Sequence, residues 1–431
     1  MKSGTVRTEI SRRGFLQRAV VSAGVLAAPA IIPASALGAD GKTPPSERIV
    51  MGSIGVGGRG GGLFDSFRAR SDVEMVAVCD VREERSAAAA SRAGTQCKPY
   101  ADFRELLERK DIDAVIIATP DHWHGLVTVA ACKAGKDVYC EKPLTRTIAE
   151  GRVVCETVRR YARVLQTGSH ERSNQSSRHA CELVRNGRIG KLHTVLTNLP
   201  VTHPHVDVQP TMPVPPGFDY DMWLGPAPWV PYTERRCTGS FRYISDYAMG
   251  EFSDRGAHVH DLAHWGMGMD ASGPLELEGR GERPAEGLFN TFREFRVEMH
   301  YPGGVTAIME SKEPRGVKFI GEKGWINIAV HGSFLSASDE SILRSTLYPG
   351  EIRLHASPGS HQNDFIEVVK TRGKTVCHPE VGHRTNSACC LAEIAMLLGR
   401  KLKWDPVAER FVGDDEANRL LVRPMRAPWR M

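Results

Sequence analysis

The sequence predicts an α/β protein of two domains, a doubly wound parallel sheet followed by an α+β domain with a second sheet. A short apolar strand over 48–54 runs directly into a glycine-rich turn and an amphipathic helix. Apolar strands and helical segments then alternate as far as residue 140, which is typical of a parallel sheet. Beyond about residue 172, segments such as 295–301 alternate apolar and polar residues and indicate a half-exposed sheet. With 431 residues, the chain is long enough to bury two cores.

The first 39 residues are predicted to be a twin-arginine signal peptide and not part of the fold. Residues 11–16 read SRRGFL, and an apolar run rich in alanine and glycine follows over 19–37. Small residues at the end of this run offer a cleavage site. Twin-arginine export carries folded proteins, so we expect a periplasmic or secreted protein that acquires its cofactor before export. An uncleaved segment that acts as a membrane anchor is the alternative.

Removing this segment leaves a nearly neutral protein. Residues 1–39 carry five basic side chains and one acidic one, a net charge of +4 out of +5 for the whole chain. A remaining charge of about +1 gives no support for a nucleic-acid partner. No membrane contact is expected apart from export. The ten cysteines show no CxxC spacing, so no disulfide framework is predicted.

The glycine-rich turn predicts a dinucleotide site, because GVGGRG lies between a strand and a helix. Gly55 permits the tight turn, Gly57 lets the backbone approach a pyrophosphate, and Gly60 lets the helix and strand pack closely. The free N–H groups at the start of the helix attract the phosphates. The predicted cofactor-binding residues of this turn are Gly55, Gly57, Gly58, Arg59 and Gly60.

The next predicted strand, over 73–79, ends at Asp80, twenty residues after Gly60. A carboxylate at this point accepts hydrogen bonds from the adenosine ribose hydroxyls and repels a 2′-phosphate. The sequence therefore favours NAD over NADP as the cofactor. Arg82 argues in the other direction, since an arginine can hold the extra phosphate.

Two further strands complete the predicted sheet. A helix over 102–110 leads to a strand over 114–118, which ends in TPDHWH over 119–124. A helix over 126–134 and a strand over 137–140 then lead to the tripeptide EKP. Ligands of open α/β sheets bind at the carboxyl ends of the strands. The residues predicted to lie at the cofactor here are Thr119, Pro120, His124, Glu141 and Lys142.

In this order, the glycine-rich turn, the strand-end Asp80, the T-P-x-x-x-H segment and A-G-K-x-V-x-x-E-K-P over 134–143 resemble the glucose–fructose oxidoreductase, inositol dehydrogenase and MocA (Gfo/Idh/MocA) family. The resemblance covers nearly the whole chain after the signal peptide. It implies a Rossmann domain over 46–172 and a substrate-binding and oligomerisation domain over 173–431 with a mostly antiparallel open sheet. It also implies C-terminal helices that pack back on the first domain, and a homodimer or homotetramer.

The segment over 250–265 resembles the D-x-G-x-H-x-x-D motif of this family, which begins a helix below the nicotinamide. The resemblance implies that His258 is the catalytic base, Asp254 its orienting partner and Lys142 the cation that binds the substrate hydroxyl. In the family, Glu141 helps to fix this lysine. A histidine can remove the hydroxyl proton as hydride leaves the same carbon, and an ammonium group stabilises the developing alkoxide.

Two other pairs of residues have weaker interpretations. His260 and His264 lie four residues apart on a predicted helix and have the spacing of two metal ligands. No third ligand can be placed, so no metal site is predicted. His383 and Arg384 precede a predicted apolar helix over 387–398. Resemblance to exported family members implies that these two side chains donate hydrogen bonds to substrate hydroxyls.

The sequence therefore predicts an NAD-dependent oxidoreductase that transfers hydride between a tightly held cofactor and a hydroxyl of a sugar or cyclitol. A retained cofactor in an exported enzyme needs a second substrate to reset it. The first alternative is an NAD-dependent glycosidase that works by transient oxidation at C3 and elimination. The second is a non-catalytic sugar-binding protein, which is expected to have lost Lys142 or His258.

Overall fold

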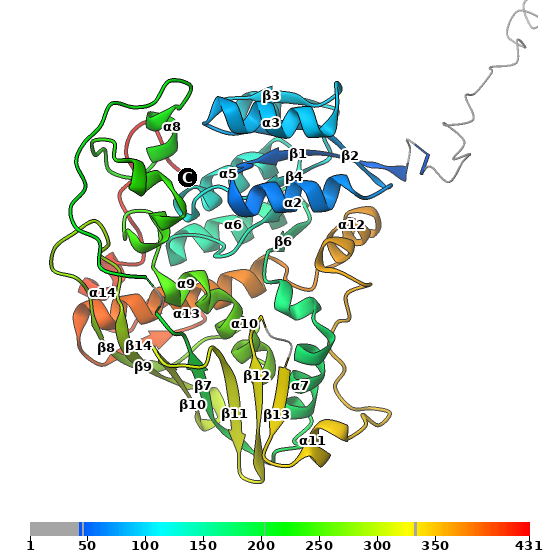
Figure 1. Ribbon diagram of the computed structural model, residues 1–431. Coiled ribbons are helices and arrows are strands. Elements are labelled where there is room, and N and C mark those ends of the chain that lie inside the picture. Colours follow the sequence, from blue (N-terminus) through cyan, green and yellow to red (C-terminus); the bar gives the residue numbers. More distant parts are fainter. Residues whose placement is uncertain (1–42, 45–46, 202, 332–333) are drawn as a thin grey trace, which may run out of the picture. The chain divides into compact units, whose positions relative to one another are not determined.

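The computed structural model describes residues 43–44, 47–201, 203–331 and 334–431. The predicted signal peptide over 1–39 lies outside the described residues, so export stays a prediction. Contacts divide the chain into Met1–Arg48 and Ile49–Met431, and the fold described below is that of the second segment (Figure 1). Within the described ranges, no helix combines the length and apolar character needed to cross a membrane.

A parallel sheet forms the core of the first domain. Its strands are β1 (Ile49–Ile54), β2 (Val73–Cys79), β3 (Lys98–Tyr100), β4 (Ala114–Ile117), β5 (Asp137–Cys140) and β6 (Leu165–Thr167). Their spatial order is β3-β2-β1-β4-β5-β6, and every neighbouring pair is parallel. The order reverses between β1 and β4, which is the point where doubly wound folds bind their ligands. The predicted Rossmann sheet is confirmed.

Helices cover both faces of this sheet (Figure 1). The connecting helices are α2 (Gly58–Arg68), α3 (Glu83–Ala93), α4 (Phe103–Glu108), α5 (Asp121–Lys133) and α6 (Ile148–Arg160). The side chains of β4 alternate between the two faces: Ala114 and Ile116 pack in the cluster that contains Phe67 of α2, and Val115 and Ile117 in the cluster that contains α4, α5 and α6. All four have no exposed surface, as expected for a parallel strand covered on both sides.

The second domain contains a larger sheet. Its strands are β7 (Leu192–Asn198), β8 (Glu276–Glu282), β9 (Glu294–Tyr301), β10 (Val305–Glu310), β11 (Gly316–Gly321), β12 (Gly324–Ala329), β13 (Phe334–Ala337), β14 (Leu402–Asp405) and β15 (Arg410–Phe411). Their order is β13-β12-β11-β7-β10-β9-β8-β14-β15. Neighbouring strands are antiparallel, except that β7 and β10 run parallel. The mostly antiparallel sheet implied by the family resemblance is confirmed.

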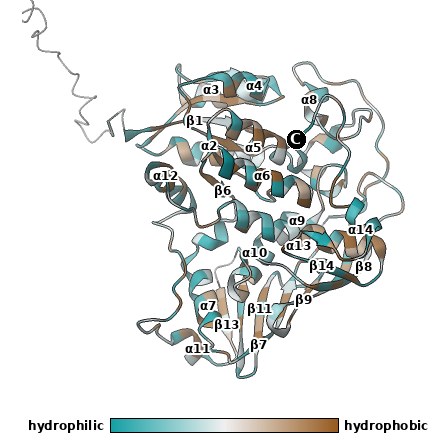
Figure 2. Cartoon of the chain, turned by 180° about the vertical axis from the view of Figure 1, so that it is seen from behind, coloured by the Kyte–Doolittle hydropathy of each residue, from teal (hydrophilic) through white to brown (hydrophobic). Residues whose placement is uncertain are grey.

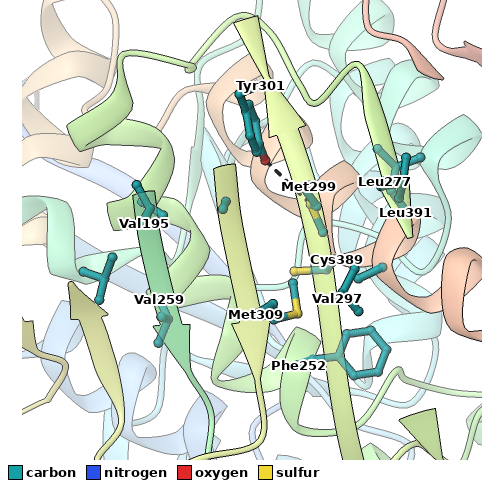
Figure 3. Close-up of a cluster of buried hydrophobic side chains, with 14 of the residues drawn as sticks. Val195, Phe252, Val259, Leu277, Val297, Met299, Tyr301, Met309, Cys389 and Leu391 are labelled. Carbon is teal, nitrogen blue, oxygen red and sulfur yellow. Dashed lines mark hydrogen bonds between the residues drawn. The ribbon is translucent and has the colours of Figure 1, made fainter. Parts of the chain in front are cut away.

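One face of this second sheet packs against two helices, α10 (Gly256–Met267) and α13 (Pro379–Leu398). Along β9, side chains alternate between buried and partly exposed positions. Figure 3 shows Val297 and Met309 of the sheet beside Cys389 of α13, and Val259 of α10 in the same cluster. Figure 2 shows hydrophobic and hydrophilic residues along the strands of this sheet, in agreement with one buried and one solvated face.

The last quarter of the chain also packs on the first domain. In α12 (His361–Thr371), the ring of Phe365 contacts Phe67 with centroids 6.0 Å apart. In α13, the carboxylate of Glu393 accepts a hydrogen bond from Arg146 at 2.8 Å. The remaining helices are α7 (Gln175–Arg185), α8 (Tyr220–Leu224), α9 (Glu251–Asp254), α11 (Glu340–Arg344) and α14 (Asp415–Arg419).

Two helices begin earlier than predicted. Helix α13 begins at Pro379 instead of residue 387, so His383 and Arg384 lie inside it. Proline fits the first helical position, since its φ is preset and its missing N–H has no partner there in any case. Helix α5 begins at Asp121 instead of residue 126, directly after Pro120 in extended conformation. The side chains of DHWH, residues 121–124, therefore have helical directions instead of those of a loop.

Candidate functional site

A cavity of about 620 Å³ lies at the carboxyl ends of β1, β2 and β4, and residues of both domains line it. It is therefore at the switch point of the parallel sheet, where a ligand is expected. The predicted site residues in its lining are Gly55, Gly57, Gly58, Arg59, Asp80, Thr119, Pro120, His124, Glu141, Lys142, Asp254 and His258.

The glycine-rich turn has the geometry that a bound pyrophosphate requires. Gly55 has φ of +81°, and a Cβ there would lie 2.7 Å from the carbonyl oxygen of Ala118 on the neighbouring strand. At Gly60, which does not line the cavity, a Cβ would lie 2.0 Å from the carbonyl oxygen of Gly55. Helix α2 starts at Gly58 with no acidic residue in its first turn, so its N-terminal N–H groups can face an anion. These residues fit a dinucleotide.

Asp80 is buried at the end of β2 and is already bonded to the turn. Its carboxylate accepts hydrogen bonds from the backbone N–H groups of Val56 and Arg82, each at 3.0 Å. Burial raises the pKa of Asp80. The guanidinium of Arg82 stacks on the ring of Phe218, 3.9 Å from its centroid, and Arg82 does not line the cavity. Arg85, three residues further along the chain, does line it.

Lys142 and Asp254 form an ion pair in the wall of the cavity. The Lys142 ammonium donates to Asp254 Oδ1 at 2.6 Å and to its backbone oxygen at 2.8 Å. A second cation, Arg242, lies 3.2 Å from the same carboxylate oxygen. Burial alone would raise the pKa of Asp254, but the charges of Lys142 and Arg242 hold that pKa well below its ordinary value. An ionised Asp254 therefore fixes the position of the Lys142 ammonium.

His258 has different neighbours from those expected. Asp254 ends α9 and directs its carboxylate to Lys142, while His258 lies in the first turn of α10. The His258 ring is 4.6 Å from His170 and 4.9 Å from His331, centroid to centroid. Its Nδ1 has no hydrogen-bond partner among the described residues. Burial, followed by the charge of Lys142, holds the pKa of His258 well below its ordinary value, so the ring is neutral. Asp254 is thus placed to position Lys142, which corrects its expected role toward His258.

Two other predicted residues connect segments of the cavity wall. The Glu141 carboxylate accepts a hydrogen bond from Arg59 Nε at 2.9 Å, which ties the strand end after β5 to the glycine-rich turn. The ring nitrogens of His124 lie 2.6 Å from the carbonyl oxygen of Pro143 and 2.9 Å from that of Thr119. His124 therefore holds the ends of β4 and β5 at a fixed separation.

The structure does not bring His383 and Arg384 to the cavity, which corrects their expected role as substrate ligands. His383 is fully buried, with Nε2 2.7 Å from the carboxylate of Glu409. Arg384 donates to Glu380 at 2.7 Å. Because α13 begins at Pro379, both side chains lie on a helix that packs them against the carboxylates of Glu409 and Glu380 instead of on a loop that faces the substrate.

The helical pair His260 and His264 also lies away from the cavity. Both side chains are buried, and His264 Nε2 lies 2.8 Å from the hydroxyl of Tyr301 on β9. Neither residue belongs to the one group of potential metal ligands found in the described part of the chain. This pair therefore has a packing role in the second domain.

Several lining residues were not predicted from the sequence. Asp121, which begins α5 shortly after the end of β4, is buried with Oδ2 unpartnered among the described residues, and burial raises its pKa to about 6. Its place at a strand end is a signal that sequence reasoning could have used. Arg242 and His331 carry no such signal, because only the packing of the second domain on the first brings them to the cavity. His170 lies shortly after the end of β6, so it carries the same kind of signal as Asp121.

Two models of one oxidoreductase family match this chain. The model described as "Oxidoreductase family, NAD-binding Rossmann fold" matches residues 49–169. The model described as "Oxidoreductase family, C-terminal alpha/beta domain" matches residues 205–431. The first domain is therefore an NAD-binding domain, and the predicted cofactor is confirmed.

Similar proteins include dehydrogenases and a glycosidase. The chain is 31% identical over 170 residues to a myo-inositol 2-dehydrogenase of Thermotoga maritima, covering 39% of this chain and 47% of that protein. It is 30% identical over 203 residues to an α-N-acetylgalactosaminidase of Shewanella oneidensis, covering 42% and 44%. The matches thus span about half the length of these curated relatives.

A solved structure of the WlbA dehydrogenase from Bordetella pertussis, in complex with NADH and UDP-GlcNAcA, has a similar fold. The TM-score is 0.65 at 16% identity, covering 83% of this chain and 98% of that one. At this identity, the likeness shows the fold alone.

Proposed function

This chain belongs to the Gfo/Idh/MocA oxidoreductase family, and we propose that it transfers hydride between NAD and a hydroxyl-bearing carbon of a sugar or cyclitol. The observation that carries the proposal is a single cavity with the glycine-rich turn in one part of its wall and Lys142 and His258 in another. Relatives named as inositol dehydrogenases support a polyhydroxylated substrate.

The residues of the chain divide the work on the substrate hydroxyl. NAD, when bound, supplies the hydride acceptor. His258 is neutral, which is the form that a general base needs to accept the hydroxyl proton. The Lys142 ammonium donates a hydrogen bond to the same oxygen and stabilises its developing negative charge. Because Asp254 already holds this ammonium at 2.6 Å, little reorganisation is needed when the substrate arrives.

A redox-neutral glycosidase is the second candidate, and the similarity to an α-N-acetylgalactosaminidase favours it. Transient oxidation at C3 would make the C2 proton acidic, and the glycosidic bond would then break by elimination. Water would add across the resulting double bond, and return of the hydride to C3 would give the free sugar. The same base and ammonium group would serve the oxidation step in both reactions. Because the glycosidase returns the hydride to the sugar, NADH would accumulate only in the dehydrogenase reaction.

The first test is to denature the purified protein and identify any released nicotinamide by mass spectrometry. NAD or NADH at close to one per subunit supports a tightly held cofactor. The protein is then incubated with a panel of free sugars, cyclitols and aryl glycosides, while NADH absorbance and reducing sugar are both followed. Net NADH supports the dehydrogenase, and free reducing sugar without NADH supports the glycosidase. If no compound produces NADH or reducing sugar although NAD is bound, the result supports the non-catalytic sugar-binding alternative.

Substitution of the two reacting groups tests their roles. Lys142→Ala and His258→Ala are each expected to lower turnover by about 10²- to 10⁴-fold, with NAD binding retained. His205→Ala is the matched control, because this histidine pairs with Asp207 on the surface and does not line the cavity. Normal turnover in both cavity variants would show that the assignment is wrong.

We further propose export through the twin-arginine pathway, supported by the SRRGFL segment and the apolar run that follows it. Replacing Arg12 and Arg13 by lysine is expected to retain the protein in the cytoplasm of a bacterial host. N-terminal sequencing of the exported protein should locate the cleavage site among residues 34–39. The proposed homodimer or homotetramer is checked by light scattering on the purified protein.

A further inference from the structure

We propose that this chain binds a divalent transition-metal ion through His170, Glu171 and His331, at the wall of the cofactor cavity. One ligand atom from each of these side chains lies within 4.8 Å of the other two. His170 and His331 both line the cavity. The proposal replaces the sequence-based expectation of no metal site. It also goes beyond the proposed function and does not depend on hydride transfer.

The three side chains come from two distant segments. His170 and Glu171 begin a 3-10 helix (His170–Ser173) that follows β6. His331 follows β12 and has φ of +66°. The Glu171 carboxylate accepts the backbone N–H of His331 at 3.2 Å, and the same oxygen lies 3.3 Å from His331 Nδ1 and 4.0 Å from His170 Nδ1. Glu171 thus stands between two imidazoles, one from each domain.

A fourth side chain provides an independent observation. His258 is only 3% exposed, yet its Nδ1 has no hydrogen-bond partner among the described residues. Its ring lies 4.6 Å from that of His170 and 4.9 Å from that of His331. A buried imidazole nitrogen normally has a partner. A metal ion, or a water molecule bound to it, among these rings would supply one.

The ligand types determine which ions fit. Two imidazoles and one carboxylate suit zinc, iron, nickel or copper better than magnesium or calcium, which prefer oxygen ligands. Ligand atoms about 2.1 Å from a tetrahedral zinc ion lie about 3.4 Å apart. Ligand atoms that are now up to 4.8 Å apart therefore have to approach one another by up to about 1.4 Å on binding. His331 can make this movement, because about a third of its side chain is exposed. Three protein ligands leave a position open toward the cavity, where a substrate oxygen can bind.

Zinc is the probe for the test. The purified full-length protein is treated with a chelator, loaded with NAD and titrated calorimetrically with Zn²⁺. We expect one zinc ion per chain, with affinity lowered on the order of 100-fold in Glu171→Gln and His331→Ala. His205→Ala is the control, because it removes a histidine that also lies beside a carboxylate, at 3.2 Å, but on the surface. Co²⁺ should give a ligand-field absorption spectrum in the wild type that Glu171→Gln and His331→Ala both lose.

Two results would overturn the proposal. One is a wild-type protein that takes up no zinc, in which case Glu171 only pairs with His331. The other is equal zinc affinity in the wild type, Glu171→Gln and His331→Ala. NADH fluorescence enhancement shows whether each variant is folded. If His331→Ala is not folded, the nearly isosteric Glu171→Gln decides the outcome. Zinc affinity and the Co²⁺ spectrum are measured without turnover. Failure of the metal proposal is therefore distinguished from failure of the proposed hydride transfer, which the activity assays test.

Discussion

Replacing Gly60 by alanine is expected to disrupt the cofactor site through a backbone clash. The added Cβ would lie 2.0 Å from the carbonyl oxygen of Gly55, whereas real Cβ atoms essentially never approach a neighbour within 3.0 Å. The turn and helix α2 must therefore separate by at least 1.0 Å. Both neighbouring atoms at Gly55 belong to the backbone, so no side chain can rotate away to relieve the contact.

The size of the effect follows from this displacement. Overpacking of a well-packed site costs about 1–3 kcal/mol in the free energy of unfolding. A shift of about 1 Å in a positioned group can cost about 10²-fold in function, so we expect NAD affinity to fall by at least about tenfold. Calorimetric titration with NAD and urea unfolding measure the two quantities.

Gly62→Ala is the matched control in the same helix. Gly62 is exposed, and an added Cβ there would meet nothing within 4 Å. Alanine is favoured over glycine inside a helix by about 1 kcal/mol, so this variant should be slightly more stable and bind NAD normally. If Gly60→Ala bound NAD as tightly as Gly62→Ala and unfolded at the same urea concentration, the close packing of α2 on the turn would be refuted.

Two further predictions concern stability. Burial raises the pKa of Asp121 from 3.8 to about 6, so its contribution is fully present below pH 4 and is lost as the pH rises to about 6. Asp121→Asn should therefore match the wild type near pH 4 and exceed it at pH 7 by up to about 3 kcal/mol in urea unfolding; an equal difference at both pH values would contradict this. Met309→Ala, in the core of the second sheet (Figure 3), should cost about 2–5 kcal/mol. Val407→Ala, at a position that is 90% exposed, should change stability by less than about 0.5 kcal/mol. Comparable losses in these two variants would contradict the assignment of the core.

The cofactor half of the site was predictable because its signals are local. Each parallel strand ends at the same edge of the sheet, so a motif at a strand end is placed at the cavity once the strand is recognised. Asp80, Thr119 and Lys142 were placed in this way, and all three line the cavity. The glycines of the turn were predicted for the same reason. The steric need at Gly60 arises from Gly55 of the same strand–turn–helix unit, whereas Gly55 is crowded by Ala118, directly after β4.

The substrate half depends on contacts between residues that are far apart in the chain. The family resemblance implied that Asp254 orients His258, but tertiary packing directs its carboxylate to Lys142 and Arg242 instead. Likewise, nothing local indicates that His331 reaches Glu171, 160 residues earlier in the chain.

The sequence by itself therefore determined the parallel sheet and the dinucleotide turn, because each is written in a continuous segment. Only the tertiary structure decided which charges pair in the cavity and which histidines gather there. Such contacts depend on how the second sheet and its helices pack against the first domain, and no period or spacing along the chain encodes that geometry.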